Sequence, residues 1–145
     1  MALTTTLHRT VVLSVEPLLD VERFEVYRVA LEFQQLVPRL LPRKGCAALR
    51  DQLDRASSSI LLCLAEGVGR FSRADKANFY TMARGSTMES AAVLDVLVSR
   101  GLLEPALHRQ GRWLLVRVAQ MLTKLILRMQ SDAASATVPV CSARP

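Results

Sequence analysis

The sequence contains few of the residues with which proteins usually bind metals or catalyse reactions. It has three cysteines and two histidines in 145 residues. Because no CxxC pair is present and no histidine lies at metal-ligand spacing from Cys46, Cys63 or Cys141, neither a zinc site nor a disulfide framework is predicted. Paired carboxylates and a nucleophile with a recognisable histidine partner are also missing. We therefore expect no catalytic residues, no metal, no cofactor and no enzymatic activity.

Long apolar runs are absent as well. The start of the chain, MALTTTLHRTVVLSVEPLLD, holds too short and broken an apolar segment for a signal peptide or a membrane-spanning helix. Together with the odd number of cysteines, this favours a soluble protein of the reducing cytoplasm that has no membrane partner.

Aromatic residues make up only 5% of the chain, and glycine and proline number six each. A composition that is half apolar with few aromatics favours aliphatic helix packing over a β-sandwich or barrel. The alternating pattern of a strand is missing except in the fragment TVVLSV near the start. At this length we expect one domain with one core.

Acidic residues are fewer than basic ones, at 13 Asp and Glu against 19 Lys and Arg, which gives a formal net charge of +6. Such an excess attracts polyanions but does not identify a fold. Arginines outnumber lysines sixteen to three. This ratio favours bidentate phosphate contacts, and it equally fits a bias in genomic base composition.

The sequence does contain four apolar runs with helical periodicity. The first follows Asp20, a predicted N-cap. Its main stripe consists of Val26, Ala30, Phe33, Val37 and Leu40. A second stripe beside it consists of Phe24, Tyr27 and Leu31. So wide an apolar arc predicts two covering neighbours, and Pro38 is expected to kink or end the helix near Val37.

The second run extends from about Cys46 to Val68, and the fourth from Glu104–Pro105 to about Gln130. Small residues in the middle of the second run, Ser57 to Ser59, are interpreted as packing spacers that can bond to backbone carbonyls. The apolar face of the second run consists of Leu49, Leu53, Ala56, Ile60, Cys63 and Gly67. The fourth run has its seam at Leu114, Val118, Met121 and Leu125, widened by Leu115, Leu122, Ile126 and Met129.

The stretch CLAEGVGRFSRAD separates the second run from the third. A phosphate-binding loop needs a preceding strand and usually a GK[ST] ending, and this stretch has neither. We expect a corner between helices, with Gly69 in the left-handed conformation and Ser72 as the N-cap of the third helix. That helix is predicted to end at about Arg100, with Gly101 as its left-handed C-cap, and Gly85 inside it is expected at a close packing contact.

Glu66 lies near the end of the second helix, where the helix dipole disfavours a negative charge. We therefore predict that Glu66 and Arg84 each form a structural ion pair, without requiring that they pair with each other. Arg70 is the local candidate partner of Glu66.

These runs predict an all-α fold, an antiparallel up-down-up-down four-helix bundle over residues 20–130. Residues 1–19 are expected to form an N-terminal arm, as a short flanking strand or a loose segment. Residues 131–145 are small, polar and aperiodic, and they are predicted to be a disordered tail.

Two motifs resemble a known family. QLDRASSSILLCLAEGVGR at residues 52–70 and FYTMARGSTMES at residues 79–90 are similar to QLRRAxxSIxxNIAEGxGR and FxxxARGSxxEL of the four-helix bundle proteins encoded in intervening sequences of bacterial 23S rRNA genes. FEVYRVALEF also resembles the first helix of that family. The similarity extends from about Phe24 to Leu125. Cys63 replaces the asparagine of the family, Asp54 a common basic residue and Ser90 a leucine.

This resemblance implies a homopentamer of four-helix bundles. It also implies kinship with the accessory variability proteins of diversity-generating retroelements, which are basic pentamers that bind nucleic acid and a reverse transcriptase. For the present chain, the resemblance therefore suggests RNA or DNA and a reverse transcriptase as partners.

Helical projection places part of the positive charge on one face of the fourth helix. The residues predicted to bind nucleic-acid phosphates are Arg117, Lys124 and Arg128 on that face, Arg70, Arg73 and Lys76 at the glycine corner, and Arg112 off the line. A helical stripe of charge is also the ordinary solvated face of a bundle. Trp113, near the stripe, is interpreted as an interface or core residue, with base stacking as the alternative.

Two functions are compatible with these features. The leading hypothesis is a non-catalytic oligomer that binds structured RNA or a ribonucleoprotein through basic surfaces, with affinity that falls as salt rises. The alternative is a homo-oligomeric interaction scaffold without a nucleic-acid role, in which the charges keep the protein soluble.

Overall fold

The computed structural model describes residues 18–41 and 45–135, and the regular secondary structure of these residues is entirely helical. A short 3₁₀ helix, η1 (Asp20–Arg23), is followed by α1 (Glu25–Leu40), α2 (Ala47–Gly69), α3 (Arg73–Ser99) and α4 (Pro105–Ser135). The predicted all-α fold is confirmed. Most of the predicted N-terminal arm, with the TVVLSV fragment, and the tail from residue 136 lie outside the described residues.

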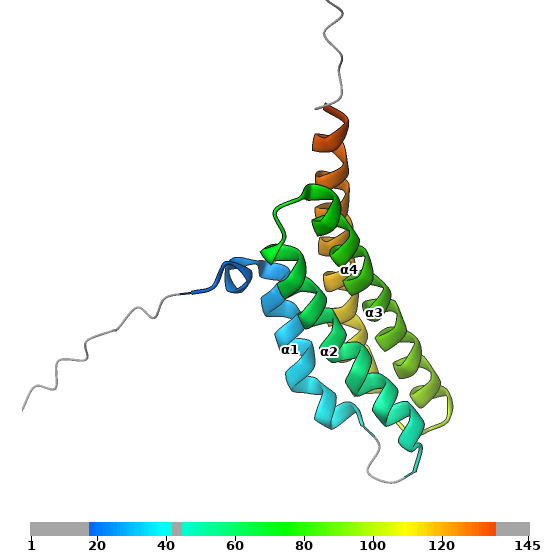
Figure 1. Cartoon of the computed structure of the whole chain (residues 1–145). Helices are drawn as coiled ribbons and strands as arrows, with labels where there is room; N and C mark the ends of the chain where they lie inside the picture. Colours follow the sequence, from blue (N-terminus) through cyan, green and yellow to red (C-terminus); the bar gives the residue numbers. More distant parts are fainter. Residues whose placement is uncertain (1–17, 42–44, 136–145) are drawn as a thin grey trace, which may run out of the picture.

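Consecutive helices run antiparallel, as the up-down-up-down prediction requires (Figure 1). Helix α3 packs between α2 and α4, and α1 contacts α2 and α4 from the other side. With 16 residues, α1 is about 24 Å long, whereas the 31 residues of α4 extend over about 46 Å. The last turns of α4 therefore project beyond the rest of the bundle (Figure 1). In the described part of the chain, no helix combines the length and hydropathy needed to cross a membrane.

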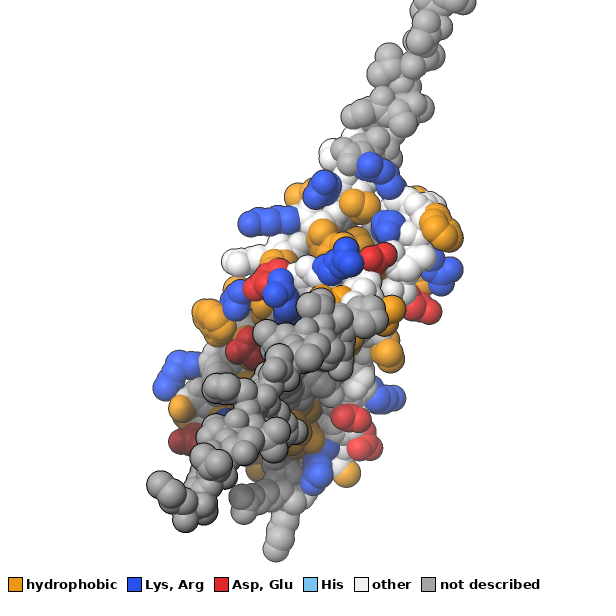
Figure 2. All heavy atoms as spheres, turned by 90° about the vertical axis from the view of Figure 1, so that its left-hand side faces the viewer, with side chains coloured by type: hydrophobic (Ala, Val, Ile, Leu, Met, Phe, Trp, Pro, Cys, Tyr) orange, Lys and Arg blue, Asp and Glu red, His pale blue; other side chains and the backbone are white. Residues whose placement is uncertain are grey.

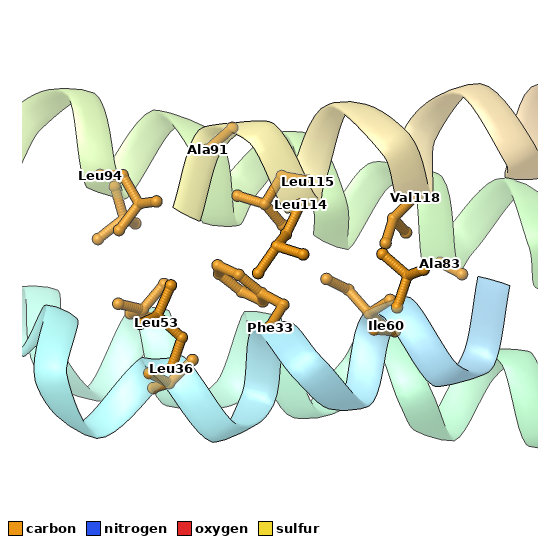
Figure 3. Packing of buried hydrophobic residues seen from close by; sticks show 14 of the residues in the cluster. Phe33, Leu36, Leu53, Ile60, Ala83, Ala91, Leu94, Leu114, Leu115 and Val118 are labelled. Carbon is orange, nitrogen blue, oxygen red and sulfur yellow. The ribbon is translucent and has the colours of Figure 1, made fainter. Parts of the chain in front are cut away.

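The core lies along the bundle axis and is built from aliphatic side chains around Phe33 of α1 (Figure 3). Every member of the main stripe predicted for α1 is buried. The predicted faces of α2 and α4 also point inward, although the seam of α4 is fully buried only as far as Val118, and its members Met121 and Leu125 are partly buried. Helical periodicity thus identified most of the core, because a 3.6-residue repeat maps directly onto one helix face.

The second stripe predicted for α1 was placed on the wrong flank. Phe24 and Tyr27 are only partly buried and Leu31 is exposed, whereas Val29 and Leu36 are buried. A helix with two neighbours buries a wide arc, but the sequence of that helix does not say on which side the second neighbour lies.

Local signals predicted several helix ends correctly. The Ser72 Oγ accepts a hydrogen bond from the Asp75 N–H at 3.4 Å, which caps α3. Gly101 has a φ of +68° and follows the end of α3. The Leu102 N–H bonds to the carbonyl of Leu97 at 2.9 Å, and this left-handed turn is a Schellman motif. Helix α4 starts at Pro105, as predicted.

Other predicted ends and turns were wrong. Asp20 opens η1, and Phe24, without a side-chain hydrogen bond, is the N-cap of α1. Pro38 does not end the helix near Val37: it lies inside α1, which continues to Leu40, because the fixed φ of proline is helical and the buried Leu40 side chain anchors the last turn. Helix α4 continues to Ser135, five residues past the predicted end and into the segment expected to be a disordered tail.

The glycines have roles that differ from the predicted ones. Gly69 is helical and not left-handed; α2 ends when Arg70 becomes extended, with a φ of −78° and a ψ of 146°. Close contacts lie instead at Gly67, where an added Cβ would be 2.7 Å from Cε1 of Tyr80, and at Gly111, where it would be 2.8 Å from Cδ1 of Leu94. Gly85, expected at a packing contact, has nothing within 4 Å of such a Cβ.

Candidate nucleic-acid interface

The fold brings members of the two predicted basic clusters together. The corner between α2 and α3 and the C-terminal half of α4 lie at the same end of the antiparallel bundle (Figure 1). Arg73 and Lys76 of α3 and Arg128 of α4 line one open depression of about 360 Å³. Residues that are more than fifty positions apart in the chain therefore contribute positive charge to a single surface.

This depression has an apolar floor and adjoins a second one. Its remaining lining residues are Phe24, Phe71, Tyr80, Leu125 and Met129. The second depression, of about 250 Å³, shares Phe24, Leu125 and Arg128 with the first and adds Glu25, Val26, Met121 and Lys124. We call the two depressions together the apical groove. Figure 2 shows lysine and arginine side chains among apolar ones at this end of the bundle.

Lys124 and Arg128 are the cations of the apical groove whose side chains are available to an external ligand. They lie one turn apart on α4, and both are exposed. Among the described residues, neither side chain has a hydrogen bond or an ion pair. An exposed cation without a protein partner keeps its full capacity for an external anion.

Lys76 and Arg70 are held in place by the corner itself. The Lys76 Nζ donates a hydrogen bond to the carbonyl of Val68 at 3.0 Å, in the last turn of α2. A cation at this position compensates the negative end of the helix dipole. The guanidinium of Arg70 lies over the ring of Phe79, 4.6 Å from its centroid. Both side chains thus contact the corner that they flank.

Arg117 lies on the same face of α4 as Lys124 and Arg128, but its charge is partly compensated. It pairs with Glu25 at 3.4 Å, and Glu25 also pairs with Arg28 at 3.1 Å. The Arg117 guanidinium lies 4.8 Å from the ring centroid of Trp113. Trp113 is 57% exposed, so it is not a core residue of this chain.

Arg112 does not reach the apical groove. It lies near the start of α4 and contacts Asp95 of α3 at 3.6 Å. The same carboxylate is 2.7 Å from Nε2 of His108. These three side chains join α3 to α4 near the opposite end of the bundle, where a structural role accounts for the charge of Arg112.

Glu66 and Arg84 have no ion pair within the described residues. The Glu66 side chain is exposed, and Arg84 donates a hydrogen bond from Nε to Thr123 Oγ1 at 3.0 Å instead. The structural ion pairs predicted for them therefore do not form inside the described chain. The serines of α2 do act as spacers: Ser57 bonds to the Asp54 carbonyl, and Ser59 accepts a hydrogen bond from Ser86 of α3.

Sequence reasoning missed the aromatic members of the site. Phe71 is fully exposed, at 102% of its reference area, in the short connection between α2 and α3. It belongs to no periodic apolar stripe, and its position between Arg70 and Ser72 was the available signal for an exposed aromatic. Tyr80 forms part of the floor, and burial raises the pKa of its hydroxyl above 10.0.

The described residues contain no group of three or more His, Cys, Asp or Glu side chains that could hold a metal ion. The chain matches the family model described as 23S rRNA-intervening sequence protein over residues 22–124. The match covers more than half of the chain, from η1 through most of α4. No curated protein matches the chain.

Proposed function

The chain belongs to the 23S rRNA-intervening sequence protein family, and from this premise we propose that it is a non-catalytic protein that binds nucleic acid through the apical groove. The observation that carries the proposal is the pair of exposed, unpaired cations Lys124 and Arg128 beside Arg73 and Lys76. Phosphate groups are the anions that such a cluster suits best, because arginine binds them in a bidentate manner and lysine as a point charge.

The net charge supports the same partner. A formal charge of +6 on 145 residues attracts polyanions over the whole surface. Within the apical groove, the only acidic lining residue is Glu25, and it already pairs with Arg28 and Arg117. A phosphate at Lys124 and Arg128 therefore meets little local repulsion.

Structured RNA, free or in a ribonucleoprotein, is the partner that we favour. The family name refers to an intervening sequence of 23S rRNA. We further propose a reverse transcriptase as a protein partner, on the expected kinship with retroelement accessory proteins. The phosphate contacts proposed here require neither base recognition nor a recognition helix.

The test is fluorescence polarisation of a labelled RNA hairpin at about 50 mM and about 200 mM salt. Lys124→Gln/Arg128→Gln is expected to weaken binding and to lower the slope of log affinity against log salt by about one per lost phosphate contact. Arg100→Gln/Arg109→Gln is the matched control, because it removes two exposed charges at the opposite end of the bundle. Equal losses in both variants would mean that general charge, and not the groove, binds the RNA. Absence of binding at low salt would refute the proposed function.

A specific observation also favours self-association, the second candidate function. Exposed apolar positions follow one face of α3 at Met82, Gly85, Met88 and Ala92. A neighbouring depression between α3 and α4 has Met88, Val116 and Ala119 in its lining. Met88 and Val116 are each 46% exposed. An apolar face of this kind is typical of an oligomer interface.

We propose that copies of the chain associate through this α3–α4 face, with a pentamer as the expected assembly. Native mass spectrometry measures the number of copies. Met88→Arg and Val116→Arg should each reduce the assembly to a smaller species, whereas Leu62→Arg, an exposed apolar position on α2, should not. In an oligomer the apical groove is repeated around the symmetry axis, so RNA binding should weaken when the assembly dissociates. If assembly persists in both arginine variants, a different face holds the copies together.

A further inference from the structure

The apical groove has more apolar surface than phosphate binding requires. A site that only grips the backbone of a duplex needs positive charge on an open surface. Here the cations surround a floor that includes Phe24, Leu125 and Met129. A ligand that fills this site must therefore combine an apolar face with a negative charge.

Phe71 adds an exposed aromatic ring at the border of this depression. Its side chain is fully exposed, yet it borders the same depression as Arg73 and Arg128. The corner that carries it is held on both sides, since Lys76 bonds to the Val68 carbonyl and the Ser72 Oγ caps α3. The phenyl ring is thus presented to solvent from a fixed backbone, which is the arrangement of a stacking platform.

An unpaired nucleotide has the matching chemistry. Its base offers a flat face for stacking, and its phosphate lies one sugar away from that face. In a duplex the faces of the bases are covered by their neighbours, so Phe71 and the apolar floor would have nothing to bind. The first depression, at about 360 Å³, is at the small end of the range for ligand sites, which suits one nucleotide better than a longer segment.

We propose that the apical groove binds an unpaired nucleotide of a single-stranded or looped RNA, with the base against Phe71 and the floor and the phosphates on Lys124 and Arg128. This inference rests on the proposed nucleic-acid function and specifies its ligand. It predicts that the protein prefers RNA with accessible bases to fully paired RNA.

The experiment compares three labelled RNAs at one salt concentration: an unstructured single strand, a hairpin with an open loop, and a blunt duplex without unpaired bases. The single strand and the hairpin should bind more tightly than the duplex. Phe71→Ala should weaken binding of the single strand by about 5- to 150-fold, the range for loss of a stacking aromatic. Binding of the duplex should remain unchanged. Trp113→Ala is the matched control, because it removes an exposed aromatic that does not line the groove.

A second readout locates the base. A single strand that carries 5-iodouridine, irradiated in complex with the wild-type protein, should crosslink to the peptide that contains Phe71. Circular dichroism and native mass spectrometry of Phe71→Ala should match the wild type, since a fully exposed side chain contributes little to folding.

The outcomes separate this inference from the function on which it rests. If no RNA binds at low salt, the proposed function fails and the inference fails with it. If all three RNAs bind equally and Phe71→Ala has no effect, the phosphate-binding function stands and the unpaired-nucleotide site is refuted. Weaker binding in Trp113→Ala but not in Phe71→Ala, or a changed assembly in Phe71→Ala, would also refute it, because the aromatic would then stack elsewhere or serve an interface.

Discussion

Replacement of Gly67 by alanine tests the packing at the corner that carries the apical groove. The new Cβ would lie 2.7 Å from Cε1 and 2.9 Å from Cδ1 of Tyr80, and 3.1 Å from Cβ of Phe79. Favourable carbon–carbon contacts begin at about 3.5 Å, so these atoms would overlap. Tyr80 is buried, at 2% exposure, so a shift of its ring or of the helix backbone is needed to relieve the overlap.

The magnitude follows from two opposing terms. Overpacking of a buried site costs about 1–3 kcal/mol. Alanine gains up to about 1 kcal/mol over glycine in a helix, and less in the last turn of α2, where Gly67 lies. We expect Gly67→Ala to lower the free energy of unfolding by about 1 kcal/mol. Gly85→Ala, with nothing within 4 Å of its new Cβ, should raise it by about 1 kcal/mol.

The assay is urea unfolding followed by the helical circular dichroism signal, with both variants at the same low protein concentration because association changes the apparent stability. The slope of the free energy of unfolding against urea should stay constant. In a Tyr80→Leu background the cost of Gly67→Ala should fall, since part of the overlap is removed. If Gly67→Ala is as stable as Gly85→Ala, or if Gly67→Ala is equally destabilising with and without Tyr80→Leu, close packing between Gly67 and Tyr80 does not determine the stability of the corner.

Three further predictions concern stability. Ser72→Ala should lower the free energy of unfolding by about 1 kcal/mol in urea titrations, because the Asp75 N–H loses its acceptor and α3 its N-cap, and Ser72→Thr should retain most of the wild-type stability. Phe33→Ala should cost about 3–5 kcal/mol in the same assay, since Phe33 is 1% exposed at the centre of the core; a loss below 1 kcal/mol would contradict its central role. Burial raises the pKa of Tyr80 above its ordinary 10.0, so the folded state favours the neutral hydroxyl. Stability from this group is complete below pH 10 and is lost as the pH rises through the raised pKa, and urea midpoints measured between about pH 8 and 11 should depend less on pH in Tyr80→Phe.

The fold could be read largely from local patterns. Helical periodicity predicted four helices, and short-range signals predicted the cap at Ser72, the left-handed turn at Gly101 and the start of α4 at Pro105. These features depend on residues within one or two turns of each other, so the sequence contains all the information that they need.

The roles of the glycines could not be read in this way. Gly67, Gly69 and Gly85 all lie in helices, and what distinguishes them is the side chain from another helix that does or does not cover each one. Of these three, Gly67 alone has a neighbour, Tyr80, close enough to exclude a Cβ. A contact between two helices depends on their relative rotation, which neither helix specifies alone.

The candidate site likewise has features that the sequence predicted and features that depend on contacts between helices. The sequence by itself determined which residues are basic, that Lys124 and Arg128 share a face of α4, and that Arg70, Arg73 and Lys76 adjoin the corner. These statements need only residue identity and the period of a helix.

Only the tertiary structure decided which of these charges remain available. It placed the corner beside the end of α4 and paired Arg117 with Glu25 and Arg112 with Asp95. It also left Phe71 without cover. The physical reason is that pairing and exposure depend on distances between segments remote in the chain, and those distances exist only once the hydrophobic core has fixed how the helices pack.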